Sequence, residues 1–143
     1  AAMYEKIPYV VAIKEATGSL DMASAIATAC DITIVSGDDS LTLPIAAVGG
    51  KGVVSVLANI LPREVRTLCD HIAAGDLAAA QTQHKRLFPM FKAQFCETNP
   101  IPIKAAMAMA GLCNNELRLP MATMDEALEP MLRETFNPFI DMK

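Results

Sequence analysis

Several features that would identify common classes of protein are missing from this chain of 143 residues. Tryptophan is absent, histidine occurs twice, and the 12 basic residues are outnumbered by 16 acidic ones. The basic residues form no cluster, so no nucleic-acid partner is expected. No apolar run approaches the roughly 20 residues of a membrane-spanning helix, and no cationic leader opens the chain. We therefore expect a globular, cytoplasmic protein with no membrane partner. Residues 1–6 predict the last turns of a helix, and the first residue is Ala rather than Met, so we expect that the sequence starts inside a longer chain.

The cysteines lack the spacing of a metal or redox site. The chain has four, at Cys30, Cys69, Cys96 and Cys113, and no two of them form a C-x-x-C pair. Zinc sites and redox motifs depend on such close pairs. We therefore expect no metal, and four free thiols that are mostly buried as small apolar side chains.

The most informative stretch is the apolar run Tyr9–Ile13, which is followed by Lys14 and a polar loop that closes on Gly18. The run predicts a strand buried on both faces, as in a parallel sheet. Lys14 would then stand at the carboxyl end of the strand, where α/β folds bind ligands. An amine held against apolar walls loses hydration, and its neutral form can attack a carbonyl to give a Schiff base. The alternative is a solvated lysine just past a strand, which is common.

The first half of the chain repeats a strand followed by a helix. Crossovers of this length imply parallel strands. Three parallel strands leave two open edges, so we expect a part of a larger α/β layer, such as a (β/α)₈ barrel. The predicted strands are 9–13, 31–36 and 53–57. The predicted helices are 20–30, 40–48 and 62–73, and either Ser19 or Asp21 is the expected cap of the first.

The second half predicts helices alone, which divides the chain into a barrel portion (1–75) and a helical extension (76–143). Asn99 and Thr123 are the expected caps of the second and third helices. Gly111 is the expected stop of the second helix. Pro89 and Pro130 lie inside the first and third helices and predict distortions. The three helices are expected at 76–95, 99–110 and 123–136.

Other candidate chemical groups have simpler structural interpretations. His84 lies on the apolar stripe of its helix and predicts a core histidine, whereas His71 lies on a polar face. Asp38 and Asp39 follow a strand and open a helix, which favours helix capping over acid–base catalysis. The glycine-rich segment Gly49–Gly52 precedes a strand, so a tight turn is favoured over a phosphate-binding loop.

Three motifs together resemble the second half of the dihydrodipicolinate synthase family, which belongs to the pyruvate-dependent class I aldolases. The resemblance covers nearly the whole chain, through Pro120. The Ser-Gly-Asp-Asp and Asn-Pro-Ile-Pro sequences favour this branch over the N-acetylneuraminate lyases. The motifs are Ile13–Gly18, Ser36–Asp39 followed by Gly49–Val56, and Asn99–Lys104.

This resemblance implies that Lys14 forms a Schiff base with pyruvate on the sixth strand of a TIM (β/α)₈ barrel. The resulting enamine would attack an aldehyde, which in the synthases is L-aspartate-4-semialdehyde, with no cofactor besides the covalently held pyruvate. Gly37 and Val54 match substrate-binding positions at the ends of the seventh and eighth strands, and Thr17 shapes the loop after the lysine.

The resemblance also implies what this sequence lacks. A Thr-Thr turn that holds the pyruvate carboxylate, proton-relay tyrosines and an arginine belong to the first half of the barrel, and Tyr4 and Tyr9 do not match them. The 143 residues alone are therefore expected to be inactive without the missing N-terminal half. Family members are commonly homotetramers, and Leu20 and Val48 are candidate interface residues. Two alternatives remain open, namely a related aldolase such as an N-acetylneuraminate or keto-deoxy-sugar lyase, and a truncated, non-catalytic half-barrel that serves as a binding module.

Overall fold

The computed structural model describes residues 1–142, which form two compact units. The first unit consists of Ala1–Ser55 and Arg66–His84. The second consists of Val56–Val65 and the chain from Lys85 onward. The units thus alternate along the sequence. The expected boundary at residue 75, between a barrel portion and a helical extension, is a different division and stays a prediction.

A three-stranded parallel sheet lies in the first unit. Its strands are β1 (Ala12–Glu15), β2 (Thr33–Ser36) and β3 (Gly52–Val53), in the order β1-β2-β3. Ile13 pairs with Ile34 and Lys14 pairs with Val35. The prediction of repeated strand–helix units with parallel strands is therefore confirmed.

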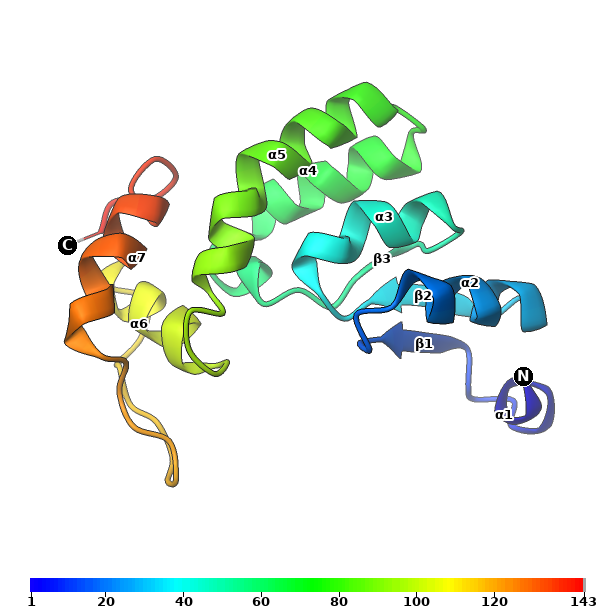
Figure 1. Cartoon of the computed structure of the whole chain (residues 1–143), viewed down its shortest axis with the longest axis horizontal. Helices are drawn as coiled ribbons and strands as arrows, with labels where there is room; N and C mark the ends of the chain where they lie inside the picture. Colours follow the sequence, from blue (N-terminus) through cyan, green and yellow to red (C-terminus); the bar gives the residue numbers. More distant parts are fainter. Residues whose placement is uncertain (143) are drawn as a thin grey trace. The chain divides into compact units, whose positions relative to one another are not determined.

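Helices α2 (Leu20–Ala29) and α3 (Thr42–Ala47) run alongside this sheet (Figure 1). Ala23 of α2, Ile34 of β2 and Ile45 of α3 form a fully buried cluster. Ile13 of β1 packs against this cluster. Because Ile13 and Ile34 are paired, they lie on the same face of the sheet, and this is the face that the helices cover.

Local side chains explain where these elements begin and end. Ser19 caps α2 because its hydroxyl accepts a hydrogen bond from the Met22 amide at 3.2 Å. The chain then returns to the sheet through the predicted tight turn, where Gly49 has a φ of 106°. Gly50 cannot carry a side chain without a clash, because a Cβ there would lie 2.5 Å from Ile45 Cγ2.

Two predicted strands differ from the observed ones. The first was expected at Tyr9–Ile13 and buried on both faces, but β1 begins at Ala12, and Tyr9 and Val11 are 91% and 67% exposed. The reason is that β1 is the end strand of the sheet, so nothing in residues 1–142 covers its outer side. The third was expected to reach residue 57, but β3 has two residues and is soon followed by the 3₁₀ helix η2 (Leu57–Asn59).

The remaining elements are helical. Their bounds are α1 (Ala2–Lys6), η1 (Asp39–Leu41), α4 (Pro62–Ala73), α5 (Leu77–Ala93), α6 (Ile101–Met109), η3 (Glu126–Leu128) and α7 (Glu129–Phe136). None of the helices within residues 1–142 is both long enough and apolar enough to cross a membrane.

The ends of α6 and α7 test the predicted signals. Gly111 has a φ of 73° and its amide donates to the Ala108 carbonyl, which confirms it as the stop of α6. The caps were less accurate: Pro100, not Asn99, is the N-cap of α6, and Asp125, not Thr123, caps η3 ahead of α7. Pro130 was expected inside a helix, but it lies in the first turn of α7, where a missing N–H costs nothing.

The second unit is built around residues of η2, α5, α6 and α7. Leu87, Leu132 and Phe136 are fully buried in it. At its surface, Arg86 pairs with Glu64 at 2.8 Å and lies 4.5 Å from the centre of the Phe139 ring. These contacts combine a salt bridge with a cation–π contact.

Candidate functional site

Lys14 is the third residue of β1, and its side chain is on the face of the sheet that α2 and α3 do not cover. Side chains alternate along a strand, so Ile13 and Glu15 point to the helix-covered face and Lys14 points away from it. The side chain of Lys14 is exposed. The apolar walls expected around the amine are therefore not formed by residues 1–142, because the described chain puts no layer on this face.

Strands β2 and β3 bring Gly37 and Val54 to the same edge of the sheet as the carboxyl end of β1. The Gly37 amide donates to the Glu15 carbonyl at 2.6 Å, and the Val54 amide donates to the Ser36 carbonyl at 2.8 Å. Each residue therefore directly follows the carboxyl end of its strand. The structure thus places Lys14, Gly37 and Val54 at one edge, on three adjacent strands, and their binding roles stay predictions.

Gly37 lies close to the Lys14 side chain. A Cβ atom at residue 37 would be 2.9 Å from Lys14 Cε and 2.6 Å from Ala16 Cβ. Such distances are well below van der Waals contact, so only glycine fits beside the lysine without movement. Because residue 37 has no side chain, the aliphatic part of the Lys14 side chain can pass next to it without a clash.

Thr17 lies in the turn after β1, and its hydroxyl is engaged on both sides. The Oγ1 atom donates to Glu15 Oε1 and accepts a hydrogen bond from the Ser19 amide at 3.2 Å. The Thr17 amide also donates to Glu15 Oε1, at 2.8 Å. These bonds tie the turn to the end of β1, and the role of Thr17 toward a substrate stays a prediction.

Helix capping was predicted for both aspartates and is confirmed for Asp38, whereas Asp39 makes a different structural contact. Asp38 accepts hydrogen bonds from the amide and the hydroxyl of Ser40, both at 3.0 Å, and caps η1. Asp39 is 2% exposed and accepts a hydrogen bond from the Ser55 hydroxyl, which links the β2 loop to the end of β3. Neither carboxylate is placed as a free acid or base.

Histidines and cysteines offer weaker candidates for catalysis. His84 was expected in the core but is only half-buried, and this burial lowers its pKa. All four cysteines are free, as predicted, although Cys113 is exposed and the other three are half-buried rather than buried. Burial is the main cause that raises the pKa of Cys69, with a further contribution from Asp70. A raised thiol pKa disfavours the reactive thiolate.

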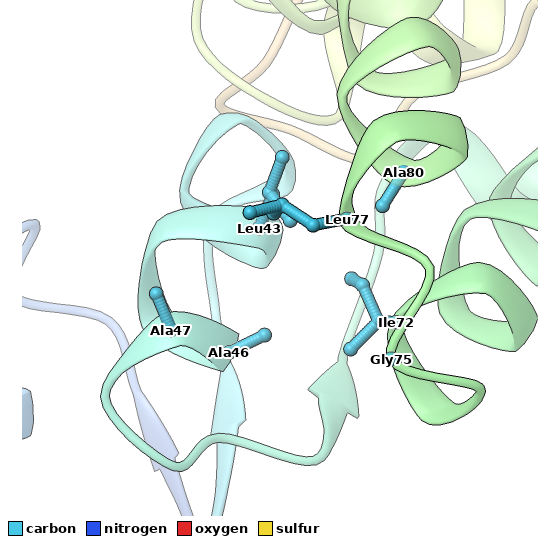
Figure 2. A pocket seen from close by; sticks show the side chains of 7 residues that line it. All are labelled: Leu43, Ala46, Ala47, Ile72, Gly75, Leu77 and Ala80. Carbon is cyan, nitrogen blue, oxygen red and sulfur yellow. The ribbon is translucent and has the colours of Figure 1, made fainter.

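Within residues 1–142, no three His, Cys, Asp or Glu residues are arranged to hold a metal ion. A cavity of about 120 Å³ lies between α3 and the α4–α5 turn (Figure 2). Its walls hold no side-chain polar atom, so it offers no acid, base or nucleophile. The residues that line it are Leu43, Ala46, Ala47, Ile72, Gly75, Leu77 and Ala80.

The sequence had not singled out Glu15 as a site residue. It is 2% exposed although its neighbour Lys14 is exposed. The signal was available, because Glu15 is two residues from Ile13, which was predicted to be buried, and therefore shares its face. An acidic residue in register with a core position is unusual enough to be examined.

Known proteins with this fold and this arrangement decide the family. A model of the dihydrodipicolinate synthetase family matches residues 1–138. The chain belongs to the dihydrodipicolinate synthetase family.

Individual relatives agree with the family model. The chain is 46% identical over 135 residues to a 4-hydroxy-tetrahydrodipicolinate synthase of Methanococcus maripaludis, and the match covers 94% of this chain and 47% of that protein. The crystal structure of dihydrodipicolinate synthase from Aquifex aeolicus superposes with a TM-score of 0.96 and 41% identity, over 99% of this chain and 50% of that one. The chloride-inhibited synthase from Acinetobacter baumannii, complexed with pyruvate, gives a TM-score of 0.88 and 33% identity, over 92% and 46% of the two chains.

The chain of this dihydrodipicolinate synthetase family member thus spans about half the length of the relatives that it matches. It corresponds to the C-terminal half of TIM-barrel enzymes, which confirms the expected fold class. The open β1 edge and the uncovered face around Lys14 are what a partial barrel is expected to present.

Proposed function

We propose that the protein that carries this chain is a 4-hydroxy-tetrahydrodipicolinate synthase, which condenses pyruvate with L-aspartate-4-semialdehyde on the route to diaminopimelate and lysine. The observation that carries the proposal is the position of Lys14, on the uncovered face at the carboxyl edge of the sheet, beside Gly37. The relatives' names support the substrate pair. The pyruvate complex of one relative supports the keto acid.

In the proposed reaction, the neutral Nζ of Lys14 attacks C2 of pyruvate, and uptake of one proton with loss of water gives an iminium. The iminium withdraws electrons from C3, which loses a proton to form an enamine. C3 of the enamine then forms a bond to the aldehyde carbon, whose oxygen takes up a proton to become a hydroxyl group. The amino group of the semialdehyde attacks C2 of the iminium, which closes the ring and releases the Lys14 amine. The covalent pyruvate supplies the electron sink, so the chemistry requires neither a metal nor an organic cofactor.

We propose that the strand-end residues shape the pyruvate site. Gly37 leaves space beside the lysine stem because it has no Cβ. Val54 is 50% exposed at the end of the next strand and offers an apolar contact. Thr17 holds the turn behind Lys14 through its bonds to Glu15. The carboxylate clamp and the proton relay of the family are expected on residues outside this sequence.

We further propose a cytoplasmic homotetramer. The helix that follows the sixth strand of the family's barrel often contributes to an interface, and Leu20 is 40% exposed on the equivalent helix α2. Val48, which directly follows α3, is partly buried and packs against the core cluster. The tetramer is tested by multi-angle light scattering on the whole protein encoded by the reading frame that contains this chain, which is called the full-length product below.

The test of the Schiff base is trapping with pyruvate and borohydride, read by intact mass. We expect a single reduced-pyruvate adduct on the full-length product, and its loss in Lys14→Ala. Lys51→Ala is the matched control, because Lys51 is exposed in the turn at the opposite, amino end of β3. An adduct that persists in Lys14→Ala would refute the proposal.

The aldehyde is tested by turnover. The full-length product should condense pyruvate with L-aspartate-4-semialdehyde and should not cleave N-acetylneuraminate. The 143 residues alone should show no measurable turnover with either substrate, because they contain no residues for the carboxylate clamp or the relay. Cleavage of N-acetylneuraminate would move the protein to the related lyases.

A further inference from the structure

Glu15 combines features that a residue next to an exposed lysine does not ordinarily have. Its side chain lies on the helix-covered face of the sheet and is 2% exposed, whereas the neighbouring Lys14 is exposed on the other face. A buried carboxylate is costly unless its oxygens are hydrogen-bonded. The hydrogen bonds of Glu15 therefore indicate its structural role.

One carboxylate oxygen holds the turn that follows the lysine. Glu15 Oε1 accepts hydrogen bonds from the Thr17 amide, at 2.8 Å, and from the Thr17 hydroxyl. Thr17 in turn accepts from the amide of Ser19, which is the cap of α2. Glu15 therefore connects the end of β1 to the start of α2 over a span of five residues.

The backbone of Glu15 holds the second strand end. Its carbonyl accepts the Gly37 amide at 2.6 Å, and Gly37 is the residue whose absent Cβ leaves space for the Lys14 stem. The two segments that border Lys14, the Thr17 turn and the Gly37 turn, are thus both bonded to Glu15. A movement of Glu15 would be transmitted to both sides of the lysine.

The second oxygen makes the arrangement unusual. Glu15 Oε2 is buried and has no hydrogen-bond partner among the described residues. By contrast, the other buried carboxylate in the sheet region, Asp39, reaches across to Ser55. A half-satisfied buried carboxylate costs stability, and departures from good packing of this kind concentrate at functional sites.

We infer that Glu15 is a positioning residue for Lys14, which fixes the turns on both sides of the amine so that it meets the carbonyl of pyruvate in a productive orientation. The inference rests on the proposed Schiff-base function. The side chain of Glu15 acts through Thr17 and touches no reacting atom, whereas the backbone bond to Gly37 is kept in any variant of residue 15. Its loss should therefore lower the rate of Schiff-base formation more than the affinity for pyruvate.

The experiment measures the rate of borohydride trapping against pyruvate concentration in the full-length product. We expect Glu15→Ala to reduce the maximal trapping rate about tenfold or more, with a change of less than about threefold in the half-saturating concentration. Glu15→Gln should restore most of the rate, because its amide oxygen can accept both bonds from Thr17 and the lost oxygen Oε2 made none. Ser19→Ala is the structural control: it removes the α2 cap at the far end of the same turn and should lower Tm without changing the trapping rate.

A double-mutant cycle tests whether Glu15 acts through Thr17. Thr17→Val removes the hydroxyl bond, and the combination with Glu15→Ala should be little slower than Glu15→Ala alone. If Glu15→Ala does not fold, slower trapping in Thr17→Val tests the same link from its other end. Full rate in folded Glu15→Ala, or additive effects in the cycle, would overturn the inference and leave the Schiff base intact. Absence of any adduct on the unmutated protein would instead overturn the proposed function, and the inference with it.

Discussion

Gly37 and Gly52 belong to neighbouring segments of the sheet but have very different surroundings. A Cβ at Gly37 would meet three atoms within 2.9 Å, one of which is a backbone oxygen of Glu15. A Cβ at Gly52 would meet nothing within 4 Å. The two glycines therefore form a natural matched pair for measuring how tightly the turn at Gly37 packs against residues 14–16.

We predict that Gly37→Ala lowers the free energy of unfolding by about 1–3 kcal/mol, because the added methyl group forces the backbone or Ala16 to move. Gly52→Ala should be neutral or stabilising by up to about 1 kcal/mol, since alanine restricts the unfolded chain and meets no obstacle in the folded one. Urea denaturation of the two variants beside the unmutated chain measures both values. Equal stabilities of the variants would show that the Gly37 turn relaxes freely.

At the scale of elements, α5 contains a pH-sensitive residue. Burial lowers the pKa of His84, so the folded protein favours its neutral form more than the unfolded chain does. The unfolded chain binds the proton near the ordinary histidine pKa of about 6.5. Stability should therefore fall as the pH drops below about 6.5, and it should recover as the pH rises again.

Replacement of this residue isolates its contribution. We predict that Tm falls less between about pH 7.5 and about pH 5.5 in His84→Gln than in the unmutated chain, because glutamine has no proton to take up. Thermal unfolding followed by circular dichroism at several pH values provides the comparison. Parallel Tm profiles for the two proteins would assign the acid sensitivity to other groups.

The elements also show which parts of the fold a sequence can predict. The order of strands and helices, the turn at Gly49 and the stop at Gly111 follow from local patterns, and the structure has them. The burial of Tyr9 and the length of the third strand depended on neighbours that the described chain does not supply, and these predictions were wrong. Pro130 was misjudged because a proline in the first turn of a helix and one in its interior differ only by where the helix begins.

The same distinction holds for the candidate site. The position of Lys14 at a strand end followed from the apolar run that precedes it. The hydrogen bonds that join Glu15 to Thr17 and Gly37 could not be predicted in this way, because they depend on how two loops meet after folding. Contacts of that kind are set by tertiary packing, which single-sequence patterns do not encode.

At the scale of the whole molecule, the exposed end strand is the main hazard. β1 pairs only with β2 among the described residues, and apolar side chains flank its free edge, with Val11 67% and Tyr9 91% exposed. Open edges of this kind pair with other chains. We predict that the isolated 143-residue chain self-associates through this edge.

Val11→Lys should reduce the average mass of the isolated chain in light scattering at a fixed concentration, because a charge beside the edge opposes pairing. Leu119→Lys is the control, since Leu119 is 92% exposed but lies outside any strand. A mass that falls only in Leu119→Lys would place the association elsewhere. A monomeric unmutated chain would contradict the prediction directly.

The uncovered face of the sheet has a further consequence for chemical footprinting. Lys14 is exposed while that face is open, so an amine-acylating reagent should modify it as readily as the exposed Lys51. Once another layer covers the face, Lys14 becomes shielded and Lys51, at the opposite end of the sheet, remains an internal reference. The ratio of the two modified peptides in a mass spectrum then reports whether the barrel has closed, without any assay of its chemistry.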